Sequence, residues 1–352
     1  MTTARSELVD ESLTPYYHCI SRCVRRAFLC GEGYEHRKDW IEQRLQELCS
    51  IFAIECYGYA IMDNHLHILV KLDSRRLAEW SDEEIARRWT RLFPLRDQDG
   101  QPLEATDAWI DLRMQDKKWL QNARTRLCNL GWFMKCLKEP LARMANKEDN
   151  CRGVFWESRY KSVAILDEES LLTTCAYIDL NPVAAGVAET PETSQHTSFH
   201  ACIEHVRQQD GLQKLQDGLS TQTSTPELEK EHWLGSLEAH GSAGESGLLP
   251  GFTLSCYCRL VDWSSRLLRP GKTALDSQTA SIFTRLGWEA DRWETTLRSL
   301  FSEGKQVGGV LGNEQSLQRA AAKRRCRFVK NRVARAAFHS GASAGEERAS
   351  AP

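Results

Sequence analysis

The alternation of apolar and polar positions predicts a strand between residues 61 and 71. Successive side chains of a strand point to opposite faces, so the apolar positions of this run share one face. They are Leu66, Ile68 and Val70. His65 and His67 lie together on the other face. Two adjacent imidazoles supply half of a site for a divalent metal, although two surface histidines on a half-exposed sheet give the same pattern.

The sequence on the N-terminal side of this strand predicts two further strands and a helix. A β-type run covers residues 16–21, a helix with apolar positions near 3.6 spacing runs from Asp39 to about Phe52, and another strand covers 54–61. Asp63 and Asn64 tolerate left-handed backbone, so they predict the tight turn of a hairpin. The order strand, helix, strand, strand predicts a split βαβ, or ferredoxin-like, sheet that still needs a second helix and a fourth strand.

These two elements follow an insertion of about sixty polar and charged residues, 72–130. The second helix is predicted over 133–145, where Pro140 should kink it or break it in two. Residues 163–166 then predict the fourth strand. The fold class expected from this order is α+β.

Asp167 is the predicted N-cap of a further helix that runs to about Leu180. Tyr177 falls on the polar face of this helix, opposite the apolar stripe, which favours a chemical role over a packing role. Asn181 lies one helical turn after Tyr177. Because it precedes Pro182, however, Asn181 can instead be the N-cap of the next turn.

The rest of the chain predicts a second unit. Residues 1–206 form the first domain, and 207–247, rich in Gln, Ser, Thr and Gly, are predicted to be a linker. Residues 248–338 predict a mainly helical domain, and 339–352 a disordered tail. No acidic residue occurs between 315 and 345, so the basic run there indicates DNA binding. Its expected contacts are Arg324, Arg325 and Lys330.

Composition limits the class of protein. The 352 residues carry a formal net charge of −2, so any basic surface must be local. No run approaches the roughly 18 apolar residues of a membrane span, and the N-terminus lacks the apolar segment of a signal peptide. The 13 cysteines are scattered and contain no Cys-x-x-Cys, which argues against zinc knuckles and a disulfide framework. A reduced, cytoplasmic protein without membrane partners is therefore expected.

Residues 155–161 interleave aromatic rings with cations, a pattern suited to single-stranded DNA, in which bases stack on rings and cations meet phosphates. Phe155 is expected to pack beneath this loop instead. A basic cluster after the first strand can grip the foot of a DNA hairpin or form a solvated turn. The expected contacts are Trp156, Arg159, Tyr160 and Lys161 in the loop, and Arg22, Arg25 and Arg26 in the cluster.

Four segments in this order resemble the single-tyrosine HUH transposases, and among them the REP-associated tyrosine transposases. The segments are YHCISR at 17–22, MDNHLH at 62–67, FWESRYK at 155–161 and YIDLNPVAAG at 177–186. The resemblance implies a ferredoxin-like nuclease domain that cleaves and rejoins hairpin-forming single-stranded DNA through a 5′-phosphotyrosine. The insertion at 72–130 and the chain after 207 depart from the compact form of that family.

By position, the resemblance assigns the metal to His65, His67 and Asn181, and the nucleophile to Tyr177. Mg²⁺ and Mn²⁺ both suit two imidazoles and an amide oxygen, whereas a zinc hydrolase would usually want a third strong ligand. Whether Tyr177 acts in its own subunit or across a homodimer stays open. Two alternatives remain: a catalytically silent DNA-binding regulator, and a metal-dependent hydrolase of a small substrate. The hydrolase leaves the basic and aromatic segments unexplained.

Overall fold

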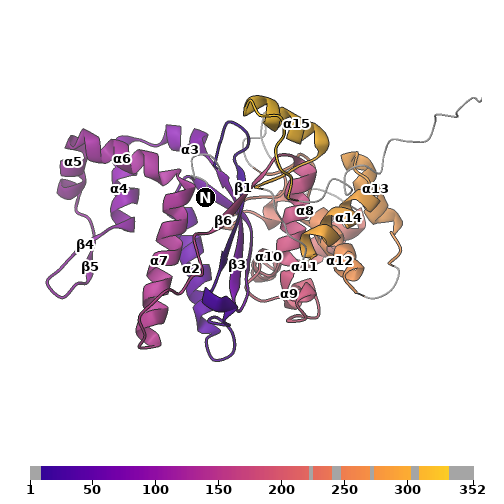
Figure 1. The fold of residues 1–352 in the computed structure, drawn as a ribbon, viewed down its shortest axis with the longest axis horizontal. Coiled ribbons are helices and arrows are strands. Elements are labelled where there is room, and N and C mark those ends of the chain that lie inside the picture. The colour runs from indigo at the N-terminus through magenta and orange to yellow at the C-terminus, as the bar shows by residue number, and fades with distance from the viewer. Residues whose placement is uncertain (1–8, 222–224, 240–246, 270–272, 303–308, 333–352) are drawn as a thin grey trace, which may run out of the picture.

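The structure is a computed structural model that describes residues 9–221, 225–239, 247–269, 273–302 and 309–332. Within these ranges, a five-stranded sheet with the order β2-β3-β1-β6-β7 lies at the centre (Figure 1). Its strands are β1 (Tyr16–Arg22), β2 (Ile54–Ile61), β3 (His65–Leu72), β6 (Lys161–Ile165) and β7 (Val310–Leu311). The pair β6 and β7 is parallel and the other neighbours are antiparallel. The fold is thus mixed α+β with a mostly antiparallel sheet.

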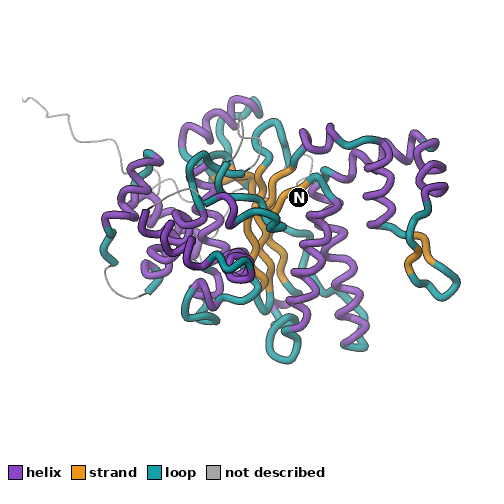
Figure 2. The backbone as a smooth tube through the Cα atoms, turned by 180° about the vertical axis from the view of Figure 1, so that it is seen from behind, coloured by secondary structure: helices purple, strands orange, loops and turns teal. Residues whose placement is uncertain are grey.

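Helices cover both faces of the sheet (Figures 1 and 2). On one face lie α2 (His36–Ile51) and α7 (Leu130–Glu148). The helices on the other face are α8 (Glu168–Asp179), α9 (Asn181–Ala184), α10 (Ser198–Gln208), α11 (Leu212–Thr221), α12 (Leu254–Leu267), α13 (Ser277–Leu286) and α14 (Ala290–Phe301). Short 3-10 turns lie at Val24–Arg26, Pro191–Thr193 and Pro226–Leu228, and α15 (Glu314–Lys323) follows β7.

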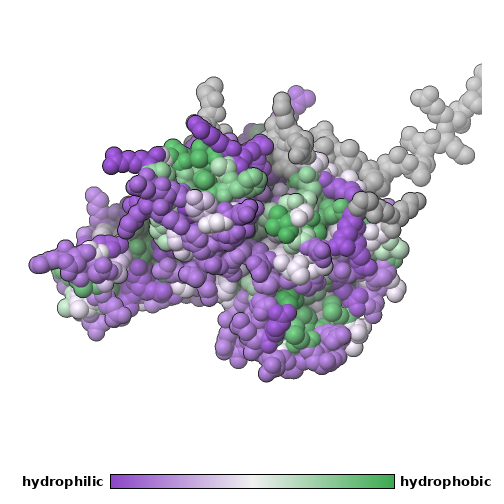
Figure 3. Space-filling view, turned by 90° about the horizontal axis from the view of Figure 1, so that it is seen from below, coloured by the Kyte–Doolittle hydropathy of each residue, from purple (hydrophilic) through white to green (hydrophobic). Residues whose placement is uncertain are grey.

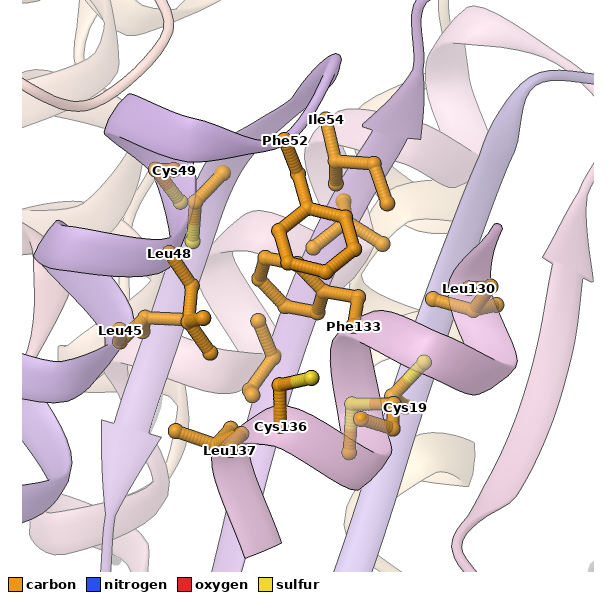
Figure 4. Packing of buried hydrophobic residues seen from close by; sticks show 14 of the residues in the cluster. Cys19, Leu45, Leu48, Cys49, Phe52, Ile54, Leu130, Phe133, Cys136 and Leu137 are labelled. Atoms are coloured by element: carbon orange, nitrogen blue, oxygen red, sulfur yellow. The ribbon is translucent and has the colours of Figure 1, made fainter. Parts of the chain in front are cut away.

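The predicted division of β3 into two faces is confirmed. Leu66, Ile68 and Val70 belong to the hydrophobic core beneath α2 and α7, whereas Leu69 belongs to the core on the opposite face. In the first core the rings of Phe52 and Phe133 meet edge to face, with centroids 5.4 Å apart (Figure 4). The hairpin between β2 and β3 is also confirmed.

Of the two predicted effects of Pro140, a kink or a break, the break does not occur, because α7 is one helix of 19 residues. Proline has no N–H, so the carbonyl four residues earlier, that of Cys136, loses its helical partner. Nε of Arg44, on α2, donates to this carbonyl oxygen at 3.2 Å. The neighbouring helix therefore replaces the missing hydrogen bond.

Helix α8 begins as predicted, since the carboxylate of Asp167 accepts from the backbone N–H of Ser170 at 2.9 Å. Its predicted polar face is not solvated, however. All residues from Glu169 to Asp179 are buried, because α12 and α14 as well as the sheet pack against α8. Tyr177 is one of the residues that α14 covers.

The segment predicted to be a linker is largely folded. It contains α11, and its leucines Leu215, Leu228 and Leu237 are buried in the core beside α8. Trp263 and Trp293 of the later helices belong to this same core, and β7 extends the sheet. The boundary between domains 1–206 and 248–338 stays a prediction, but residues on both sides of it share one core. The predicted tail, 339–352, lies outside the described residues.

The insertion forms a separate helical arm beside α2 and α7 (Figure 1). Its elements are α3 (Ser74–Glu79), α4 (Asp82–Leu92), β4 (Leu95–Arg96), β5 (Pro102–Leu103), α5 (Asp107–Gln115) and α6 (Lys117–Leu127). Trp89 of α4 meets Trp132 of α7 with ring centroids 5.6 Å apart, which ties the arm to the body. Seen from below, the surface is mainly hydrophilic with separated hydrophobic patches (Figure 3). Among the described helices, none has both the length and the apolarity to cross a membrane.

Candidate active site

The structure brings the two histidines of β3 together with the tyrosine of α8. The ring centroids of His65 and His67 are 4.9 Å apart, and those of His67 and Tyr177 are 5.4 Å apart. Arg22 on β1 is the direct cross-strand partner of His65, so their side chains share a face. Residues that are far apart in the sequence therefore surround one position between the sheet and α8.

His65 is neutral near pH 7 and its tautomer is defined. Burial, with a smaller contribution from the charge of Arg22, lowers its pKa to about 4. The amide of Asn64 donates through Nδ2 to the carbonyl of Arg26 at 3.3 Å, which directs its Oδ1 toward Nδ1 of His65 at 2.7 Å. Nδ1 of His65 therefore carries the proton, and Nε2 keeps a lone pair that can bind a metal.

His67 is held by a third histidine that the sequence analysis did not single out. Nε2 of His18 lies 2.9 Å from Nδ1 of His67, and both side chains are buried. Burial lowers the pKa of each well below its usual value, so both rings are neutral. When Nδ1 of His67 donates to His18, Nε2 of His67 keeps its lone pair. Finding His18 requires the pairing of β1 with β3, which no local sequence pattern provides.

Tyr177 is only 7% exposed. Its ring lies against Phe301, the last residue of α14, with centroids 4.7 Å apart. Burial raises the pKa of the phenol, while the charges of Arg332 and Arg22 and a hydrogen bond from Asn181 oppose that rise. The phenol thus lies in a locally positive environment beneath an aromatic cover.

Asn181 is not the cap of the following turn, so that alternative is wrong. Leu180 occupies the cap position, and the side chain of Asn181 turns back toward α8. Its Nδ2 donates to the carbonyl of Tyr177 at 2.6 Å and lies 3.4 Å from that of Ile178. This arrangement leaves Oδ1 of Asn181 without a role in the helix and available as a ligand.

The residues present fit a divalent cation in their chemistry. His65 and His67 each have one ring nitrogen fixed by a neighbouring side chain and the other free, which is the usual arrangement of metal-binding histidines. Asn181 adds an amide oxygen. In the described ranges no three His, Cys, Asp or Glu side chains gather as a metal site, but the expected set contains only two such side chains, both histidines, with an asparagine as the third ligand.

The basic clusters expected to contact DNA meet at one end of the sheet. The N–H of Val24 donates to Phe155 at 2.9 Å, and that of Glu157 donates to Arg22 at 2.8 Å, so the two loops run side by side. Arg25 and Arg26 are exposed and adopt left-handed backbone, with φ near 55°. The remaining cations, Arg159 and Lys161, are exposed at the same end.

Trp156 and Tyr160 pack into the core, an arrangement that was predicted for at least one ring of this loop and assigned to Phe155. They are 8% and 7% exposed, so their faces do not offer open platforms for stacking. Nε1 of Trp156 donates to the carbonyl of Lys138 at 3.0 Å, which explains how a buried indole is satisfied. Both residues line a cavity of about 600 Å³ beside Trp132.

The C-terminal cations divide between two places. Arg325 and Lys330 are exposed after α15, and Arg324 lies close enough to Tyr17 for its charge to act on that phenol, whose pKa burial raises. Arg332, which was not among the expected contacts, instead lies near Tyr177. The end of the described chain therefore contributes to the site.

Comparison of this chain with known protein families and structures gives one weak structural match. No protein-family model matches the chain, and no curated protein matches its sequence. A solved structure of a REP-associated tyrosine transposase bound to a REP hairpin matches with a TM-score of 0.32 and 10% identity. The match covers 54% of this chain and 78% of that one. A similarity this low establishes neither the fold family nor the activity of this chain.

Proposed function

We propose that this protein is a metal-dependent tyrosine transposase that nicks and rejoins hairpin-bearing single-stranded DNA. The observation that carries the proposal is the placement of two neutral imidazoles, His65 and His67, beside the phenol of Tyr177. The order of the four sequence motifs supports it. We also interpret β2-β3-β1-β6, with α2 and α7 on one face, as the expected ferredoxin-like arrangement.

In the proposed reaction, the oxygen of Tyr177 attacks a backbone phosphorus of DNA. A Tyr–phosphorus bond forms, the bond from phosphorus to the 3′ oxygen breaks, and the 3′ oxygen leaves with a proton as a free hydroxyl. The reverse attack by a 3′ hydroxyl rejoins the strand. A divalent metal bound by His65, His67 and Asn181 would polarise the phosphate and offset its charge.

The chain's own residues have separate roles in this proposal. Asn64 and His18 orient the rings of His65 and His67. The charges of Arg22 and Arg332 favour the ionised phenol over the neutral one. The ring of Phe301 lies against that of Tyr177, so we expect it to shift when a phosphate binds beside the phenol.

The test is cleavage of an end-labelled hairpin oligonucleotide with a single-stranded flank, in Mn²⁺, in Mg²⁺ and in EDTA. In the presence of metal, the wild-type protein should release one fragment with a free 3′ hydroxyl and stay covalently bound, through denaturation, to the 5′ end of the other fragment. Neither product should form in EDTA. Tyr177→Phe should bind the hairpin and form no adduct, while Tyr34→Phe, which alters an exposed tyrosine outside the site, should behave as wild type. An adduct that persists in Tyr177→Phe would refute the assignment of the nucleophile.

A second candidate, the silent DNA-binding regulator, is favoured by the burial of Tyr177 under Phe301. The same assay separates the two functions. A regulator would bind the hairpin and give neither a nick nor an adduct in any metal.

A further inference from the structure

The segment after α15 places a guanidinium beside the candidate site. The N–H of Arg332 donates to the carbonyl of Val310 on β7 at 2.7 Å, and Asn331 pairs with the same strand. Nδ2 of Asn331 also donates to the carbonyl of Gly312 at 3.2 Å. Arg332 is therefore fixed to the edge of the sheet by its backbone, which leaves its side chain to reach toward α8.

The groups that feel the charge of Arg332 are neutral or positive. Burial lowers the pKa of His18 and His67, and the charge of Arg332 lowers them further. Burial also lowers the pKa of Arg332; the phenol of Tyr177 raises it and the charge of Arg22 lowers it again. None of these neighbours supplies a negative charge at neutral pH.

Nε of Arg332 is buried and meets no hydrogen-bond acceptor within the described residues. Among the residues that the structure describes, no carboxylate forms an ion pair with the guanidinium of Arg332. Arginine cannot shed its proton in a protein, and a buried charge without a partner is unfavourable. The guanidinium of Arg332 thus lacks an acceptor for Nε and a counter-charge, and a bound anion would supply both.

We propose that Arg332, together with Arg22, binds a phosphodiester of single-stranded DNA against Tyr177. The planar fork of a guanidinium matches two oxygens of one phosphate, which a single ammonium group does not. Arg22 lies opposite His65 on the same sheet face, and the exposed Lys161 continues the positive charge at that end. The choice of DNA as the source of the phosphodiester rests on the proposed function; the anion site does not.

The test measures binding by the full-length protein, without cleavage. Thermal unfolding is followed in EDTA and chloride buffer at constant ionic strength, with three probes: a thymidine tetranucleotide without terminal phosphates, its uncharged methylphosphonate analogue, and inorganic phosphate. The variants are Arg332→Met, Arg332→Lys and the control Arg325→Met, which removes an exposed guanidinium from the same segment. Because no reaction is needed, the result is independent of whether Tyr177 forms an adduct.

The tetranucleotide should raise the Tm of the wild type and of Arg325→Met, and the methylphosphonate analogue should not. Arg332→Met should have a higher Tm than the wild type without probe, because a half-buried guanidinium whose Nε lacks an acceptor is gone. It should also bind the tetranucleotide roughly 10- to 100-fold more weakly, as expected on loss of hydrogen bonds from a charged group. Arg332→Lys keeps the charge, so its affinity for the tetranucleotide should lie between those of the wild type and Arg332→Met.

Three results would overturn the proposal. The first is wild-type affinity in both Arg332 variants, and the second is equal binding of the charged and uncharged tetranucleotides. The third is a Tm increase with inorganic phosphate but none with the tetranucleotide, which would assign the site to a phosphate monoester. Should Arg332→Met fail to fold, the affinity of Arg332→Lys decides between wild-type binding and its loss.

Discussion

At the scale of single residues, the reactivity of the site depends on the orientation of His67, which His18 controls. Nε2 of His18 lies 2.9 Å from Nδ1 of His67, and when Nδ1 donates to His18, Nε2 of His67 keeps the lone pair that can bind a metal. A side chain that orients a metal ligand in this way contributes through the ligand. We expect His18→Phe to fill the same space and to weaken Mn²⁺ binding by roughly 10- to 100-fold.

Calorimetric titration of Mn²⁺ measures this effect. His67→Ala should abolish binding, His18→Phe should weaken it, and His36→Gln, which alters a half-exposed histidine elsewhere, should leave it unchanged. Undiminished Mn²⁺ affinity in His18→Phe would show that the contact with His67 does not orient a ligand.

The position of a site residue could be predicted from the sequence where it depends on the period of a single strand or helix. Alternation along β3 places His65 and His67 on one face, and the structure agrees. His18 and Arg332 could not be found in that way, because their roles depend on pairing between distant segments. The rings of Trp156 and Tyr160 were predicted to contact DNA, but both are buried. Alternating aromatic and basic residues occur in a loop that packs into the core as well as in one that binds DNA.

At the scale of elements, α7 contains a proline that its neighbour compensates. We expect Arg44→Met to lower the free energy of unfolding by about 1 kcal/mol, because the carbonyl of Cys136 loses its donor. In Pro140→Ala, the new N–H of residue 140 can bond that carbonyl, so Arg44→Met should then cost close to nothing.

Urea unfolding of the two single variants and the double variant measures the coupling. The prediction fails if Arg44→Met is equally costly with proline and with alanine at 140. Conversely, a cost that disappears with alanine would explain why the helix continues through the proline.

A second element, α8, is held by a buried carboxyl group. Asp179 accepts from the hydroxyls of Ser198 and Tyr257 and from the N–H of Phe199, on α10 and α12. Burial raises its pKa from 3.8 to about 6, although these hydrogen bonds act the other way. Because the folded protein holds the proton more tightly, the contribution to stability is full below pH 3.8 and is lost as the pH rises through about 6.

The difference between the two pKa values corresponds to about 3 kcal/mol, since each pH unit is worth about 1.4 kcal/mol. Asp179→Asn cannot ionise and should lack this dependence. Urea unfolding of both proteins between pH 4 and 7.5 should therefore show the wild type losing stability relative to the variant as the pH rises. A difference that is constant over this range would contradict the raised pKa.

The start of α8 was predictable from Asp167, but the burial of its polar face was not. That burial comes from α14, more than a hundred residues later, and no periodicity within α8 reports it. A helix with a polar stripe normally faces water, so the local pattern predicts the wrong surroundings for Tyr177.

At the scale of the whole molecule, the two predicted domains share a hydrophobic core. Tyr57 and Leu69 of the sheet lie in one cluster with Trp263 and Trp293 of the later helices. We therefore expect the full chain to unfold in one cooperative transition, with coincident midpoints by far-UV and near-UV circular dichroism. Two separated transitions would instead support independent domains.

The same shared core predicts the fate of a shortened chain. Ending the protein near Gln208 removes α12 and α14 and exposes the apolar side of α8 and the sheet. Such a chain should bind a fluorescent reporter of exposed apolar surface and lose cooperative unfolding. A shortened chain that unfolds cooperatively would contradict this expectation.

Local patterns predicted the order of the first three strands and the helix between the first two, because each has a clear period. They gave no sign of β7, since two residues are too short for a periodic signal. They also separated the C-terminal helices from the sheet, since composition alone marked 207–247 as a linker.

The most direct measurement of the central claim is the position of the DNA on the protein after reaction. Full-length protein is incubated with a hairpin oligonucleotide and Mn²⁺, digested, and mapped by peptide mass. The account predicts one modified peptide, with a nucleotide phosphate on Tyr177, in metal and not in EDTA. A nucleotide on any other residue, or DNA binding with no modified peptide in metal, would contradict it.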